Sequence, residues 1–161
     1  MKKTIIILED NLYTAEDMIE EIKNNLMQGG FVNITNRDVE IKVANSIDEA
    51  NELLESISKE DIICIIADLN MNPEGLTDEQ KKETNGAILT GWVWLYSYVW
   101  QELGMQEKYI IFYSAFINYL ESNQKYKDLH HNKNKIKLIL KSEHGMSNLC
   151  KELLRIVGGL K

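Results

Sequence analysis

Five short, β-branched segments alternate with helical patterns along this sequence, and this alternation restricts the fold more than any other feature. Such segments favour strands, because β-branched side chains pack well on a pleated sheet. They comprise residues 4–8, 39–44, 62–67, 109–113 and 136–140. Most of these runs are continuously apolar, which indicates that both faces of the sheet are buried. The sequence therefore predicts an α/β domain, a doubly wound five-stranded parallel sheet with helices on both faces.

The intervening segments carry the spacing and the end signals of helices. Apolar residues recur every three or four positions over residues 12–26, which predicts a first helix that ends at Gly29-Gly30. Ser46 and Glu49 form a capping-box pattern at the start of a second helix. Three further helices are expected over residues 85–103, 115–126 and 145–157.

Length and composition favour a single globular domain. The chain has 161 residues, 44% of them hydrophobic, which is enough to bury an ordinary core. We expect one domain over residues 1–161 and no output domain, since no linker or repeat divides the chain. No apolar run reaches the roughly 20 residues of a membrane span and no signal peptide is evident, so a cytoplasmic location is expected. The net charge of -7 disfavours binding to nucleic acid or to an anionic membrane.

Polar residues stand at the points where four of the expected strands end. They are Glu9 and Asp10 after the first strand, Asp68 after the third, Ser114 after the fourth and Lys141 after the fifth. Because the carboxyl ends of parallel strands meet at one edge of a sheet, where ligands of such folds bind, these side chains should cluster. Three clustered carboxylates repel one another unless a cation compensates their charge. Mg²⁺ is the expected cofactor, because it prefers oxygen ligands and the cluster contains no His or Cys.

This cluster has the groups that phosphoryl transfer to a carboxylate requires. With a metal ion screening the charge, Asp68 can attack phosphorus and become an aspartyl phosphate, while Lys141 and Ser114 hold the transferred oxygens. Any catalysis would be this self-catalysed transfer and the later hydrolysis of the product. A hydrolase with Asp68 as nucleophile is the weakest alternative, because it would need a second acid such as an Asp two residues on, where Asn70 stands.

Four short motifs occur in order at these strand ends. They are LEDN at residues 8–11, ADLNM at 67–71, YSA at 113–115 and LK at 140–141. Through them the sequence resembles the receiver domain of two-component response regulators over nearly its whole length. The resemblance implies a flavodoxin-like sheet with strand order 2-1-3-4-5. It also implies that Glu9, Asp10 and Asp68 hold Mg²⁺ together with the backbone carbonyl of Asn70, and that Asp68 is the phosphoacceptor.

The resemblance extends to the remaining candidates and to the partners. Ser114 would be the hydroxyl that follows the phosphoryl group, and Lys141 would be its counter-ion. Asn85-Gly86 would correspond to the Asp-Gly pair that precedes the family's third helix. A histidine kinase or phosphotransfer protein would be the phosphodonor of this stand-alone receiver, which would signal to a downstream protein by direct contact.

Two positions depart from the family's pattern and favour an alternative. Ser142 follows the lysine where the family carries a proline, and Leu138 stands where the family has its switch aromatic. These departures favour a degenerate receiver that acts as a phosphorylation-independent protein-docking module.

Two other features of the sequence call for an explanation. The connection over residues 69–84 is long for this family, contains a Thr77 capping-box pattern, and is expected to form a lid beside Asp68. The expected third helix carries three Trp and two Tyr residues on nearly every side. Packing against the 69–84 segment would cover these rings, and a homodimer or partner surface is the alternative.

Overall fold

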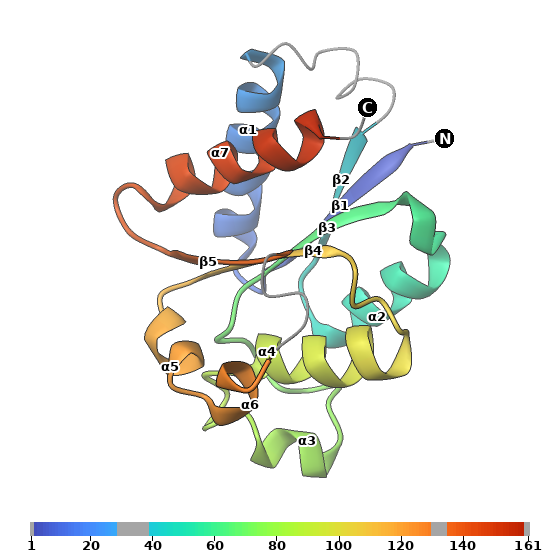
Figure 1. Cartoon of the computed structure of the whole chain (residues 1–161), viewed down its shortest axis with the longest axis vertical. Helices are drawn as coiled ribbons and strands as arrows, with labels where there is room; N and C mark the ends of the chain where they lie inside the picture. The colour runs from blue at the N-terminus through green and yellow to red at the C-terminus, as the bar shows by residue number, and fades with distance from the viewer. Residues whose placement is uncertain (1, 29–38, 130–134, 160–161) are drawn as a thin grey trace.

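The computed structural model describes residues 2–28, 39–129 and 135–159. These residues form a central sheet with helices around it (Figure 1). The strands are β1 (Lys3–Leu8), β2 (Val39–Ala44), β3 (Ile62–Ala67), β4 (Tyr109–Ser114) and β5 (Ile136–Leu140). Neighbouring strands are parallel, and their order is β2-β1-β3-β4-β5. The predicted doubly wound α/β fold and its strand order are therefore confirmed.

Helices cover both faces of this sheet. In Figure 1, α1 (Leu12–Gln28) and α7 (Gly145–Gly158) lie on one face, and α2 (Ile47–Ser56) and α4 (Thr90–Trp94) lie on the other. Helix α4 continues into the π-helical segment η3 (Leu95–Glu102). The shorter helices are η2 (Lys59–Asp61), α3 (Asp78–Lys82), α5 (Ile117–Glu121) and α6 (Gln124–Lys127). The predicted helix end at Gly29-Gly30 lies outside the described residues. Within those residues, no helix combines the length and the apolar character of a membrane span.

The side chains of each inner strand alternate between two apolar cores. In β1, Ile5 and Ile7 pack in the core that α1 and α7 complete, and Ile6 and Leu8 pack in the core that α2 and α4 complete. Both cores exclude water from these four side chains. A register slip of one residue would exchange the two sets, so the cores fix the position at which each strand ends.

The third predicted helix begins later than the sequence indicates. Asn85, Gly86 and Ala87 have φ values of 53°, 66° and 75°, which a right-handed helix does not contain. The Thr84 hydroxyl accepts a hydrogen bond from the backbone N–H of Ala87 at 3.1 Å, and these local bonds replace helical ones. The predicted start at Asn85 is therefore wrong, because the helix begins at Thr90.

The fourth predicted helix is two short helices. Helix α5 ends at Glu121, and a separate helix, α6, begins at Gln124. The side chain of Asn123 accepts a hydrogen bond from the backbone N–H of Tyr126 at 3.2 Å and so caps α6. A continuous helix through Asn123 was the wrong prediction, because an asparagine that caps a helix start interrupts the preceding helix.

The aromatic side chains of α4 and η3 are covered within one copy of the chain. Trp94 is fully buried and its Nε1 donates a hydrogen bond to Oδ1 of Asn51 on α2 at 2.8 Å. Tyr98 donates from its hydroxyl to Oε1 of Glu55, also on α2, at 3.0 Å. Trp92 is buried against Tyr126 of α6, with ring centroids 5.7 Å apart. These contacts cover the aromatic rings without a second copy of the chain. The homodimer stays a prediction, and burial of these rings does not require it.

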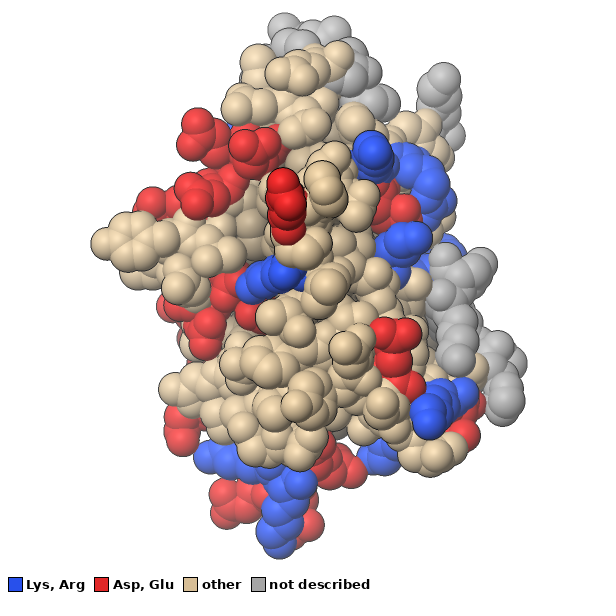
Figure 2. All heavy atoms as spheres, turned by 90° about the vertical axis from the view of Figure 1, so that its left-hand side faces the viewer, with Lys and Arg blue, Asp and Glu red and all other residues tan. Residues whose placement is uncertain are grey.

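Acidic side chains dominate part of the surface beside the sheet. They gather at the upper left of Figure 2. Helix α1 contributes Glu16, Asp17, Glu20 and Glu21, against Lys23 as its basic residue. Such a surface repels the phosphate backbone of nucleic acids, in line with the negative net charge.

Candidate functional site

Backbone hydrogen bonds between neighbouring strands continue for one residue beyond the ends of β1, β3 and β5. These bonds hold the predicted site residues in place. The N–H of Glu9 donates to the carbonyl of Ala44, and the N–H of Asp68 donates to the carbonyl of Leu8, each at 3.0 Å. On the other side of the sheet, the N–H of Lys141 donates to the carbonyl of Ser114 at 3.0 Å. The three residues therefore leave the sheet at the same edge, as the sequence predicts.

Three carboxylates converge at this edge. Glu9, Asp10 and Asp68 each place one oxygen within 4.8 Å of the others, with Glu9 buried, Asp68 half-buried and Asp10 exposed. An octahedral Mg²⁺ binds oxygens at 2.0–2.1 Å and needs them no farther apart than about 4.2 Å. The limit of 4.8 Å on their separation is close to this span, so a small rearrangement of the side chains would bring the oxygens around one ion. All three ligand atoms are oxygens, and the cluster is open to water on the side of Asp10. This donor set therefore fits Mg²⁺.

Lys141 links two of these carboxylates. Its Nζ atom lies 2.5 Å from Oε1 of Glu9 and 2.9 Å from Oδ2 of Asp68. Burial alone would lower the pKa of the Lys141 ammonium, but the charges and hydrogen bonds of Asp68 and Glu9 outweigh burial and raise it. Lys141 is therefore firmly protonated and supplies the positive charge that the carboxylates need.

Glu9 is the most enclosed carboxylate of the cluster. Burial raises the pKa of Glu9, and the nearby charge of Asp68 raises it too, although the hydrogen bond and charge of Lys141 act in the opposite direction. Its Oε2 also accepts a hydrogen bond from the backbone N–H of Asn11 at 3.2 Å. A second cation at the site would favour ionised Glu9 further, because that cation would offset part of the cost of burying the charge.

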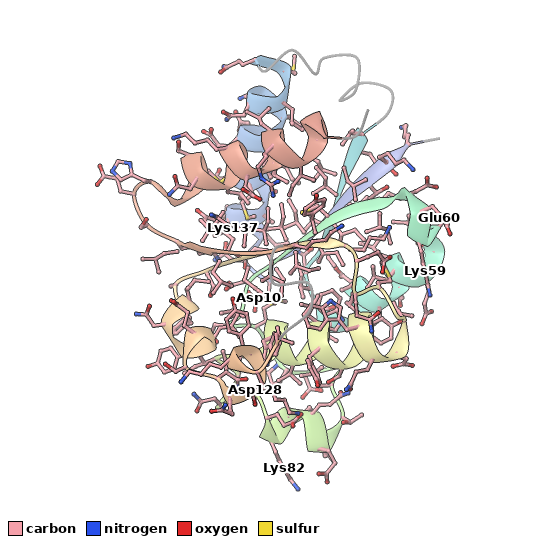
Figure 3. The ribbon with its side chains drawn as sticks, viewed as in Figure 1. Asp10, Lys59, Glu60, Lys82, Asp128 and Lys137 are labelled. Atoms are coloured by element: carbon pink, nitrogen blue, oxygen red, sulfur yellow. The ribbon has the colours of Figure 1, made fainter. Side chains whose placement is uncertain are left out.

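Three asparagine residues place hydrogen-bond donors around the cluster. The Nδ2 atom of Asn45 donates to the backbone carbonyl of Glu9 at 2.9 Å, and the backbone N–H of Asn72 donates to Oδ2 of Asp10 at 3.3 Å. The backbone N–H of Asn70 lies 3.4 Å from Oδ1 of Asp68. The two backbone N–H contacts orient the carboxylates of Asp10 and Asp68, as outer contacts do around metal ligands. Asp10, labelled in Figure 3, is thereby connected to a segment 62 positions away in sequence.

Ser114 is fully buried at the end of β4. Its Oγ accepts a hydrogen bond from the backbone N–H of Phe116 at 3.2 Å, which holds the turn before α5. The turn contact accounts for its burial, and the phosphoryl contact stays a prediction.

Gly91 is a site residue that sequence reasoning missed. A Cβ atom at this position would lie 2.0 Å from the backbone carbonyl oxygen of Asp68, so only glycine allows α4 to approach the site this closely. The N–H of Gly91 also donates to the carbonyl of Leu69 at 3.0 Å. Gly91 is the second residue of α4, whereas Asn85 and Gly86 lie before this helix with positive φ values, and their correspondence to the family's pair stays a prediction. A glycine within an otherwise helical, aromatic-rich pattern was the available signal.

A groove of about 370 Å³ opens beside this cluster, between α1 and the start of α7. Lys141 and Ser142 form part of its wall together with Tyr113, and the Nζ of Lys141 lies 5.6 Å from the centre of the Tyr113 ring. The cluster can therefore be reached from solvent on the side of Lys141.

Solved structures of response regulator proteins share this architecture. No protein-family model and no curated protein matches the chain. A response regulator receiver protein from Pseudomonas putida matches with a TM-score of 0.56 and 19% identity, over 98% of this chain and 97% of that one. A two component transcriptional regulator AraC from Clostridium phytofermentans ISDg matches with a TM-score of 0.53 and 16% identity, over 98% and 93% of the two chains. This chain has the receiver fold.

In the receiver fold of this chain, four predicted residues meet at the carboxyl edge of the sheet. Glu9, Asp10, Asp68 and Lys141 form one connected cluster. Low sequence identity to the matched structures means that the likeness establishes the fold, so function rests on these side chains.

Proposed function

We propose that this chain is a phosphoryl-accepting receiver that carries the phosphoryl group on Asp68 and signals through contacts with other proteins. One observation supports this proposal above others: a protonated lysine is bonded to a carboxylate within a group of three. An isolated acidic cluster would bind cations only. The additional fixed cation beside Asp68 is what the developing negative charge of a transferred phosphoryl group needs.

Glu9, Asp10 and Asp68 would hold Mg²⁺, with the Asn70 backbone carbonyl as a further proposed ligand. When bound, Mg²⁺ would neutralise phosphoryl oxygens and lower the repulsion between the incoming phosphate and the acidic cluster. Glu9 is buried and linked to Lys141, which fixes its carboxylate relative to that of Asp68. Asp10 is exposed and completes the site from the solvent side.

In the proposed reaction, an oxygen of the Asp68 carboxylate forms a bond to phosphorus while the P–N bond of a donor phosphohistidine breaks. The nitrogen of the leaving imidazole keeps the electron pair and takes up a proton. Lys141 does not give up its own proton, since its pKa is raised. Its ammonium would give up its bond to the Asp68 carboxylate and bond to a phosphoryl oxygen, so its charge would remain paired. Ser114 would donate its hydroxyl hydrogen to another phosphoryl oxygen, because its Oγ is only the acceptor in its bond to Phe116.

The test is phosphoryl labelling of the intact protein with a small-molecule phosphodonor, followed by mass spectrometry. We expect a single phosphoryl group to be gained with Mg²⁺ and little labelling when a chelator removes the metal. Lys141→Ala should retain some labelling, since nucleophile and metal ligands remain, but at a reduced rate. Lack of labelling in folded wild-type protein, with several donors, would contradict the proposal.

A docking module that works without phosphorylation is the second candidate. Leu138, which is partly buried and pairs with Phe112 of β4, favours it, because the resemblance places a switch aromatic at that position. A protein partner that binds wild type and Asp68→Asn equally well, with and without phosphodonor, would support this second candidate.

A further inference from the structure

Residue Asn72 contacts the candidate metal site through its backbone. Its N–H donates to Oδ2 of Asp10 at 3.3 Å, and its own Oδ1 accepts a hydrogen bond from the N–H of Glu74 at 3.0 Å. Asp10 is the exposed member of the three carboxylates. A donor on one of its oxygens restricts rotation of the carboxylate and leaves lone pairs on both oxygens for a metal ion.

Buried side chains on both sides hold Asn72 in place. Met71 is 2% exposed and Leu76 is 8% exposed, and both belong to the core that α2 and α4 complete. The N–H of Leu76 donates to the carbonyl of Pro73 at 3.1 Å, which closes a turn between the two anchors. Residues 71–76 therefore form a short strap, fixed at both ends, with the Asn72 amide directed at Asp10.

The turn of this strap lies against the start of α2. Gly75 has a φ of +98°, and a Cβ atom there would lie 2.9 Å from Oδ1 of Asp48 and 3.0 Å from Cβ of Ile47. Both the backbone conformation and the close packing require glycine. Any larger residue at position 75 must move the turn away from α2, and Asn72 is three positions from that turn.

We propose that the strap positions Asp10 for metal binding, so that the packing of Gly75 and Leu76 sets the Mg²⁺ affinity of the site. Asn72 is a positioning residue in this proposal and touches neither phosphorus nor metal. The inference rests on the proposed function only in taking Asp10 as a metal ligand. It gives the long 69–84 connection a specific role at the site, whether or not the segment also restricts access to Asp68.

The first test measures Mg²⁺ affinity from amide shifts of the full chain. Gly75→Ala should weaken Mg²⁺ binding by about tenfold, the low end of what loss of an orienting contact costs a metal site. Gly104→Ala is the matched control, because Gly104 also has a positive φ, of +68°, but no atom lies within 4 Å of its added Cβ. We expect Gly104→Ala to bind Mg²⁺ like wild type. Equal affinities of wild type and a folded Gly75→Ala would overturn the proposal.

A second measurement needs no change in the strap. Hydrogen exchange of the Asn72 amide in metal-free wild type should be slowed by its bond to Asp10 and should be faster in Asp10→Ala. The Leu76 amide, bonded to Pro73, is the internal reference and should exchange at the same rate in both proteins. Unchanged exchange at Asn72 would overturn the proposed contact even if Gly75→Ala fails to fold. Strap-dependent Mg²⁺ binding without any phosphoryl labelling would contradict the proposed function and leave this inference intact.

Discussion

The Nζ atom of Lys141 lies 2.9 Å from Oδ2 of Asp68, although 73 positions separate the two residues in sequence. The same ammonium bonds to Glu9, so one cation serves two carboxylates from different strand ends. The strand order brings the three together, because β3 lies between β1 and β4, and β4 pairs with β5. The pKa values of Glu9 and Lys141 therefore both respond to the charges of the cluster.

Removing the cation should change the titration of Glu9. Burial already raises the pKa of Glu9, and the contributions of Lys141 are the main ones that lower it. In Lys141→Ala we therefore expect the pKa of Glu9 to rise further above its ordinary value of 4.5. Carboxyl carbon shifts of metal-free protein, followed against pH, give the midpoint directly. A midpoint that stays the same or falls would show that Lys141 does not govern the charge of Glu9.

The raised pKa of Glu9 also makes stability depend on pH in a defined direction. Between 4.5 and the higher folded value, the folded protein binds more protons at Glu9 than the unfolded chain does. The contribution of Glu9 to the free energy of unfolding is thus largest below that window and falls as pH rises through it. The difference in unfolding free energy between metal-free wild type and Glu9→Gln should follow this fall.

Urea unfolding of both proteins at several pH values measures that difference. Glu52→Gln, a change at an exposed position of α2, is the control and should show no such trend. A difference that grows with pH would mean that Glu9 is stabilised as an anion.

Much of the fold and of the site could be predicted from the sequence. The five strands follow from local runs such as Ile62–Ala67, where a short, apolar segment rich in β-branched residues favours a buried strand. Given parallel strands, Asp68 and Lys141 had to meet at one edge, because the strand ends fix them there. These features depend on local pattern and topology alone.

Other features depend on tertiary contacts that the sequence does not display. Residues 85–87 have left-handed φ values and the Thr84 hydroxyl accepts a bond from Ala87, although the local pattern continues that of a helix. Gly91 matters through one backbone oxygen of Asp68, and Asn72 matters through an N–H that any residue except proline carries. Contacts made by the backbone leave little trace in side-chain patterns, which is why these two residues were missed.

Gly91→Ala should destabilise the protein and disturb the site. The new methyl group would lie 2.0 Å from the Asp68 carbonyl, so α4 or the 68–69 backbone must move. Overpacking of this kind costs about 1–3 kcal/mol or more. Gly159→Ala is the control, because its added Cβ would make ordinary contacts at 3.5 Å or more. Chemical denaturation gives both values, and a Gly91→Ala protein as stable as Gly159→Ala would contradict the close contact.

The most direct test of the central claim is to locate the phosphoryl group after incubation with Mg²⁺ and a small-molecule phosphodonor. Asp68→Asn removes the anionic nucleophile at nearly constant volume, so its fold should survive. Asp128→Asn, at an exposed position labelled in Figure 3, is the matched control. Mass spectrometry should find phosphate on Asp68 in wild type and in Asp128→Asn, and none on Asp68→Asn whose circular dichroism shows it folded. Phosphate on the Asp68→Asn protein, or none on folded wild type, would contradict the claim that Asp68 is the phosphoacceptor.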